Sequence, residues 1–160
     1  MQNLKELFEK EFKNLYAFEK QIQNAMMSLK PSRSKKLMKR VDKFTKYNTS
    51  DYATIKEMAI ILSINPGNTI DSVAQEMLNN ITEITNLDID INVKNAGLIT
   101  SFNRLVAYKT ISYYNVRQMA KALSMKKESK TLKKIEEKNQ TIAKKLKSLA
   151  RKKLFKKALI

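Results

Sequence analysis

A glutamate in the first predicted helix is the residue whose position most suggests chemistry. In the stretch LKELFEKEFKNLYAFEKQI, residues 4–22, apolar residues recur at helical spacing, and Glu19 falls on or beside their stripe. A carboxylate on the buried side of a helix is unfavourable unless a cation or hydrogen-bond donors accompany it. Glu19 could therefore bind a metal ion, pair with a lysine, or lie at the edge of the stripe and reach water.

Other reactive side chains are scarce. The chain has no cysteine and no histidine, which excludes thiolate chemistry and removes both the commonest metal ligand and the usual general base near neutral pH. With two glycines there is no glycine-rich phosphate loop. No pair of acidic residues stands at a spacing that would build one catalytic pocket. We therefore expect neither an enzyme nor a bound cofactor.

The spacing of apolar residues predicts an almost entirely helical chain of 160 residues. Helices are expected at about 2–30, 33–63, from an N-cap at Thr69 into the eighties, 92–123, and from 128 onward. The adjacent Pro66 and Gly67 mark a break, and NLDIDIN, residues 86–92, is expected to be an extended connection. Two long helix pairs joined by a crossover predict an all-α, ferritin-like four-helix bundle with an additional short helix in the long crossover. Residues 1–150 would form the bundle and 151–160 a basic C-terminal helical extension.

Charge is distributed unevenly along the chain. The net charge is +17, from 32 basic and 15 acidic residues. Residues 30–46 carry a net +7 and residues 126–160 a net +11, whereas residues 68–93 hold five acidic residues and no basic one. Such segments favour binding of nucleic acid or another polyanion through its phosphates, because no base-reading motif is present. The predicted contact residues are Arg33, Lys35, Lys36, Lys39, Arg40, Lys144, Lys145, Lys147, Arg151, Lys152, Lys153, Lys156 and Lys157.

The same basic amphipathic pattern has other interpretations. It could lie on a membrane surface, remain a solvated face, or serve self-assembly by docking on the acidic crossover of another copy. No apolar run approaches the length of about 18 residues that a membrane span needs, and the chain begins with a charged amphipathic helix rather than a secretory signal. We expect a cytoplasmic protein without a membrane span.

Several stretches resemble the YciF-like branch of the ferritin-like superfamily. The opening helix LKELFEKEFKNLYAFEKQI is similar to the first helix of that branch, and SINPGNT stands where the branch has its Gly-x-x-Pro turn. VKNAGLITSFNRLVAYKTISYYNVRQMAKAL and TLKKIEEKNQTIAKKLKSLA resemble its fourth and fifth helices. The resemblance implies a di-iron-type carboxylate site inside the bundle, an association with stress responses, and a homo-oligomer, most simply a dimer.

This chain retains few of the ligands that the resemblance implies. Glu19 matches the ligand of the first helix, and Asp51 takes a Gln or His position in the second. In the fifth helix, Glu136 or Glu137 matches. The remaining ligand positions fall on Lys46 and Tyr47 and on the run Val106, Ala107, Tyr108 and Lys109. We interpret Glu19, Asp51, Glu136 and Glu137 as vestiges of a lost metal site.

A lysine stands where a metal ligand would be. Lys109 lies on the apolar stripe of its helix, as Glu19 does on the first, so an ammonium could replace the metal charge in a buried Glu19–Lys109 pair. Tyr47 or Tyr108 would be the hydrogen-bond partner; alternatively, Lys109 extends along its stem to water. We therefore predict a metal-free, non-enzymatic, stress-associated structural or binding protein. A di-iron carboxylate protein with residual metal binding or oxidase-like activity, and a self-assembling structural protein, are the alternatives.

Overall fold

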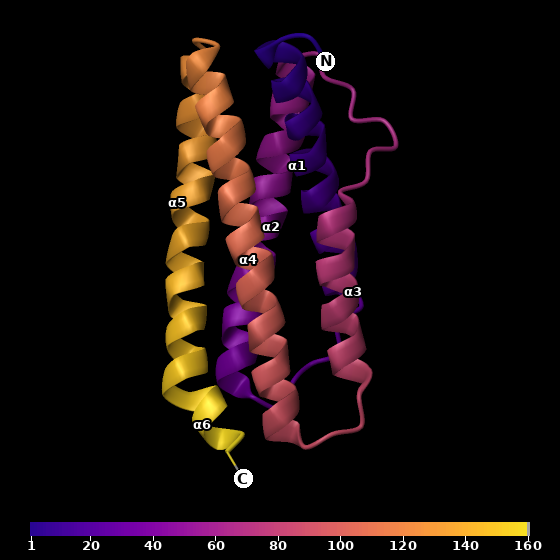
Figure 1. Cartoon of the computed structure of the whole chain (residues 1–160), viewed down its shortest axis with the longest axis vertical. Coiled ribbons are helices and arrows are strands. Elements are labelled where there is room, and N and C mark those ends of the chain that lie inside the picture. The colour runs from indigo at the N-terminus through magenta and orange to yellow at the C-terminus, as the bar shows by residue number, and fades with distance from the viewer. Residues whose placement is uncertain (160) are drawn as a thin grey trace.

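Four long helices and one shorter helix build the bundle in the computed structural model, which describes residues 1–159. They are α1 (Leu4–Met27), α2 (Lys35–Ile61), α3 (Ser72–Asn86), α4 (Ile91–Ala122) and α5 (Lys126–Leu149), followed by a π-helical turn, η1 (Ala150–Leu154), and the short α6 (Phe155–Lys157). The two helices within each pair joined by a short turn, α1–α2 and α4–α5, are antiparallel, whereas α2 and α4 run in the same direction because the crossover returns the chain along the bundle (Figure 1). Within the crossover, α3 packs on α1 and α4. The predicted all-α bundle with a short crossover helix is confirmed.

Side-chain caps fix where the helices begin. Asn3 and Ser34 accept the N–H groups of Glu6 and Leu37 at the starts of α1 and α2. The predicted cap at Thr69 is wrong, because α3 begins at Ser72 with Asp71 as its cap, at 2.9 Å from the Ala74 nitrogen. The Thr69 hydroxyl instead donates to the Pro66 carbonyl in the preceding turn, at 2.6 Å. A polar side chain in a turn therefore looked like a helix start.

The core consists of two apolar clusters separated by a polar layer. One cluster contains Phe44 and Phe102, with ring centroids 6.0 Å apart, and the other contains Phe8 and Phe12, at 5.9 Å. The polar layer between them consists of the buried residues Glu19, Asn48, Asp51, Lys109 and Asn139. Each of the four long helices contributes to this layer within its apolar stripe, so the layer crosses the middle of the bundle.

The chain continues past α5 along the bundle. Ala150 and Leu154 of η1 are buried in the same apolar cluster as Leu146, and η1 and α6 both contact α4. The predicted extension 151–160 begins within η1, and its last residue, 160, lies outside the described residues. Within residues 1–159, no helix combines the length and the apolar character that a membrane crossing needs.

Candidate functional site

Lys109 is the centre of the polar layer. Its side chain is fully buried, and its Nζ lies 2.9 Å from Glu19 Oε1, 3.1 Å from Glu19 Oε2 and 2.9 Å from Asp51 Oδ2. Leu105, Lys109 and Tyr113 follow one another at intervals of four on α4, which places the lysine on the inner face of that helix. Neither Glu19 nor Lys109 reaches water, so the interpretations of an edge glutamate and of an outward-reaching lysine do not hold.

Two neutral side chains complete the surroundings of Glu19. The Tyr113 hydroxyl donates to Glu19 Oε1 at 2.6 Å, and Asn48 Nδ2 donates to Oε2 at 2.6 Å and to the Glu19 carbonyl at 3.0 Å. The predicted partners Tyr47 and Tyr108 are wrong. Tyr108 precedes Lys109 and so points about 100° away around α4; its hydroxyl donates to Asp71 Oδ2 at 2.8 Å. The ring of Tyr47 instead lies 4.6 Å from a second lysine, Lys138.

Lys138 of α5 supplies the second positive charge. Its Nζ lies 2.5 Å from Asp51 Oδ1, while Asn139 Nδ2 donates to Asp51 Oδ2 at 3.1 Å. Glu19 and Asp51 therefore face two ammonium groups, and two negative plus two positive charges sum to zero. Sequence reasoning missed Lys138, because it is one of many lysines in a strongly basic helix; its position next to the stripe residue Asn139 was the available signal.

The other two predicted vestigial positions lie elsewhere. Glu136 is buried and pairs with Arg117 of α4, whose Nε and Nη2 are 2.5 Å and 3.4 Å from its carboxylate oxygens. Glu137 is exposed and lies 3.6 Å from Lys133 one turn earlier. Of the four carboxylates, only Glu19 and Asp51 come together, and Lys109 joins them.

This set of side chains does not fit a pair of divalent cations. A di-metal site needs several carboxylates around an oxygen-rich shell, to neutralise four positive charges. Here the two central carboxylates are already neutralised by lysines, and the third belongs to an arginine. Within residues 1–159, no group of three or more acidic side chains is placed to hold a metal ion.

The charges of the polar layer keep Lys109 and Tyr113 protonated. Burial alone would lower the pKa of Lys109, but the charges of Glu19 and Asp51 and the hydrogen bonds to them outweigh burial and raise it. Burial, together with the same two carboxylates, also raises the pKa of Tyr113 well above its ordinary value. Lys109 therefore stays charged and Tyr113 neutral near pH 7, an arrangement suited to holding four helices together rather than to transferring protons.

The second candidate site is the basic face, by which we mean the thirteen lysines and arginines predicted to contact a polyanion. All thirteen reach the surface, and none forms an ion pair within residues 1–159. The pKa of Lys36 is lowered, chiefly by a side-chain hydrogen bond with Lys153 and by repulsion from its charge. Burial and the charge of Lys157 contribute less. The start of α2 and the C-terminal helices therefore lie close together, and their positive charges are not compensated.

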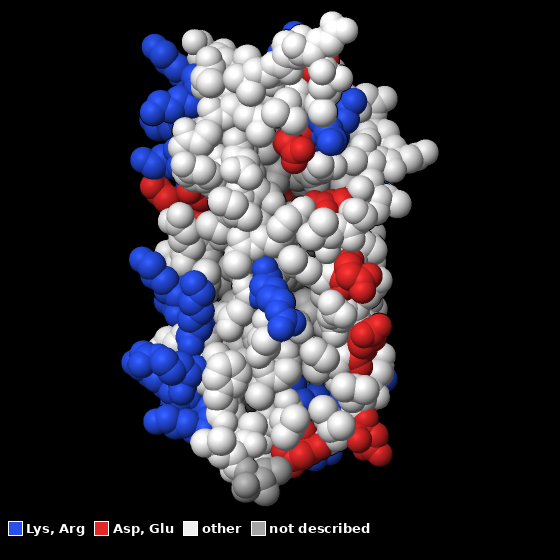
Figure 2. All heavy atoms as spheres, viewed as in Figure 1, with Lys and Arg blue, Asp and Glu red and all other residues white. Residues whose placement is uncertain are grey.

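A groove runs along this basic face. It has a volume of about 780 Å³ and is lined by Lys39, Arg40 and Lys145, among others, with Asp42 as its single acidic residue. Figure 2 shows lysine and arginine side chains gathered over the side of α5, and aspartate and glutamate over the opposite side, along α3. On the face seen in Figure 2, basic side chains therefore predominate over α5 and acidic side chains over α3.

The chain is similar to known proteins both in sequence and in fold. The sequence matches the family described as "Domain of unknown function (DUF892)" over residues 3–159. The fold is similar to the crystal structure of the stress protein YciF of E. coli, with a TM-score of 0.88 at 20% sequence identity. That match covers 94% of this chain and 96% of the other. No curated protein sequence matches the chain.

Replacing Lys109 should expose the dependence of the fold on charge balance. In the Lys109→Met variant, two buried carboxylates face a single lysine, and we expect the free energy of unfolding to fall by about 3–5 kcal/mol. The double variant Glu19→Gln, Lys109→Met leaves Asp51 paired with Lys138 and should recover much of that loss. Urea unfolding measures both effects. Lys121→Met, an exposed lysine of the same helix, is the matched control; a loss as large there would contradict the interpretation.

The raised pKa values predict a loss of stability in alkaline solution. Well below pH 10 the Tyr113 hydroxyl and the Lys109 ammonium are protonated in both the folded and the unfolded protein. Above their ordinary values of 10.0 and 10.5, the unfolded chain releases these protons while the folded protein keeps them, so stability falls as pH rises. Each group lowers the free energy of unfolding by up to about 1.4 kcal/mol per pH unit. When unfolding is measured from pH 9 upward, the free energy of unfolding should fall less steeply with pH for Tyr113→Phe than for the wild type. Parallel curves for the two proteins would contradict this prediction.

Proposed function

This chain belongs to the DUF892 family, and we propose that it is a metal-free, non-enzymatic protein that binds nucleic acid or another polyanion through its basic face. The single observation that carries the proposal is the collection of thirteen surface cations without ion-pair partners in residues 1–159. A phosphate chain that lies on such a face releases its condensed counterions, which favours binding without sequence preference. The groove between Lys39 and Lys145 offers a path for that chain.

The interior supports the non-enzymatic, metal-free part of the proposal. The carboxylates that a metal would use are each held by a lysine or an arginine, and their displacement would leave buried ammonium groups unpaired. Lys109, with its raised pKa, is a poor nucleophile and a poor base near neutral pH. A stress-associated, cytoplasmic role is also part of the proposal; the similar E. coli protein is described as a stress protein.

Self-assembly is a second candidate, favoured by the separation of charge on the surface. The α3 side is acidic and the α5 side basic, so the acidic side of one copy complements the basic side of another (Figure 2). A homo-oligomer held in this way, a dimer being the simplest, dissociates as salt rises. Its size measured across a salt series, beside nucleic-acid retention in the same buffers, separates the two candidates.

Retention of DNA and RNA on gels tests polyanion binding. At about 50 mM salt, where phosphate binding is strong, the wild type should retard both, and the salt dependence of binding should weaken by about 0.9 for each phosphate contact removed. The triple variant Lys39→Met, Lys145→Met, Lys153→Met should bind more weakly. The control, Lys5→Met, Lys10→Met, Lys20→Met, loses the same charge from exposed positions of α1 and should bind as the wild type does. No retardation at this salt, or an equal loss in both variants, would reject the proposal.

Metal analysis tests the proposal that the protein is metal-free. Protein purified after growth with added iron and manganese should contain neither metal in stoichiometric amount, and adding Fe²⁺ or Mn²⁺ should leave the thermal unfolding temperature unchanged, because a ligand that binds the folded state would raise it. Stoichiometric metal that survives dialysis would support the di-iron alternative instead.

A further inference from the structure

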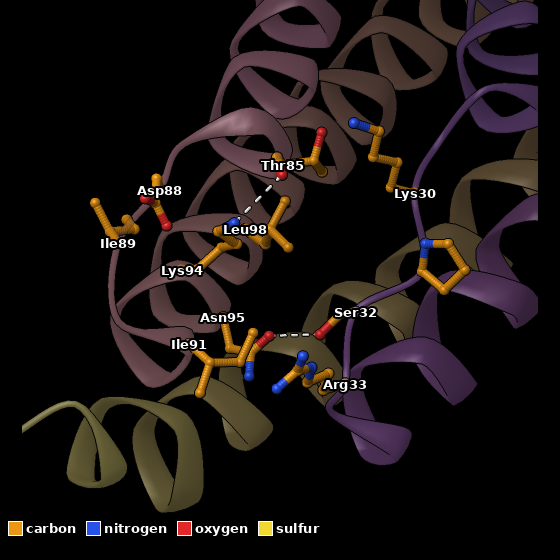
Figure 3. A pocket seen from close by; sticks show the side chains of 11 residues that line it. Lys30, Ser32, Arg33, Thr85, Asp88, Ile89, Ile91, Lys94, Asn95 and Leu98 are labelled. Carbon is orange, nitrogen blue, oxygen red and sulfur yellow. Dashed lines mark hydrogen bonds between the residues drawn. The ribbon is translucent and has the colours of Figure 1, made fainter.

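A second pocket lies at one end of the bundle, away from the polar layer. It has a volume of about 410 Å³ and opens between the α1–α2 linker and the connection from α3 to α4 (Figure 3). Lys30, Arg33 and Asn95 are among its lining residues, and Leu98 contributes apolar surface. This volume lies at the small end of the range that binds small molecules in proteins.

Three cations from two separate segments line this pocket. Lys30 and Arg33 come from the α1–α2 linker and Lys94 from the first turn of α4, whereas Asp88 is the one acidic residue in the lining. Lys30 Nζ donates to Asn86 Oδ1 at 3.0 Å and Lys94 Nζ to the Thr85 carbonyl at 3.4 Å, and both acceptors are neutral. Three positive charges and one negative charge leave the lining with a net charge of +2.

The side chain of Asn95 also lines the pocket. Asn95 is 6% exposed; its Oδ1 accepts the Ser32 hydroxyl, which leaves its Nδ2 as the donor that a ligand in the pocket could use. Figure 3 shows this nitrogen on the same side as the Arg33 guanidinium. The first N–H groups of α4 are not available, because Asp90 accepts from Asn92 and Val93 at 2.9 Å and 3.2 Å. Side chains, and not the helix end, must therefore hold a ligand.

We propose that this pocket binds a small phosphate monoester. A phosphate monoester carries a charge of about −1.5 to −2 near pH 7, which matches the net charge of the lining. Guanidinium and ammonium groups form charge-assisted hydrogen bonds with phosphate oxygens. The volume leaves space beside the phosphate for a compact polar body, and Asp88 offers an acceptor for a hydroxyl of that body. The site is separate from the polyanion-binding function proposed above, because Arg33 is the one residue common to the pocket lining and the basic face.

Amide chemical shifts measured by NMR test this site in the full chain. Ribose 5-phosphate, inorganic phosphate and ribose are titrated separately at about 0.15 M salt, where exposed charges are largely screened. We expect saturable shifts around Arg33, Asp88 and Asn95, strongest with ribose 5-phosphate, weaker with inorganic phosphate and absent with ribose. The variant Lys30→Met, Lys94→Met should bind ribose 5-phosphate at least about tenfold more weakly, because charge-assisted hydrogen bonds are lost.

A charge-matched variant separates this site from the basic face. Lys39→Met, Lys145→Met removes two lysines of the basic groove, and it should bind ribose 5-phosphate like the wild type while losing polyanion affinity. Shifts spread over the basic face, or binding that survives in Lys30→Met, Lys94→Met, would overturn the pocket. Equal binding of inorganic phosphate would overturn recognition of the ester body. If the protein does not retard DNA or RNA on gels, the NMR titrations still test the pocket independently.

Discussion

The contact of Lys109 with Glu19 and Asp51 is the interaction on which the rest of the bundle depends. Taking these charges out of water costs several kcal/mol for each ion, and only close pairing with further hydrogen bonds offsets that cost. Asn48, Tyr113 and Asn139 supply those hydrogen bonds. Because apolar clusters lie on both sides of the layer, sliding one helix by a turn would bury a charge against hydrocarbon. The layer therefore fixes how the four long helices align along the bundle.

The fold could be predicted from sequence because periodicity and loop lengths carry it. The pairing of Glu19 with Lys109 could be predicted because both residues lie on apolar stripes and because the family resemblance places both at ligand positions of one site. The other partners of these residues could not be predicted in the same way. Periodicity places a residue on a face of its own helix, but which of Tyr108 and Tyr113 meets Glu19 depends on how α1 and α4 are rotated relative to each other. Lys138 and Arg117 could not be identified as partners for another reason. In a chain with 32 basic residues, nothing in the sequence distinguishes the lysine or arginine that pairs with a buried carboxylate from the others.

The charge of the protein is divided between two regions that behave differently. The polar layer with Lys138 is neutral, so the net charge of +17 resides outside it. Surface charges are screened by salt over about 8–10 Å, whereas buried pairs are screened much less. Ionic strength therefore acts on the basic face with little effect on the interactions that hold the core.

The charges of the layer and of Lys138 are also divided by sign between the two halves of the chain. Both carboxylates, Glu19 and Asp51, belong to the α1–α2 hairpin, and both ammonium groups, Lys109 and Lys138, belong to the α4–α5 hairpin. Each hairpin formed alone would bring like charges together without compensation, and only docking of one hairpin on the other neutralises them. Neither half can then complete its core in isolation, so the chain should assemble as a single cooperative unit in which each half selects the other.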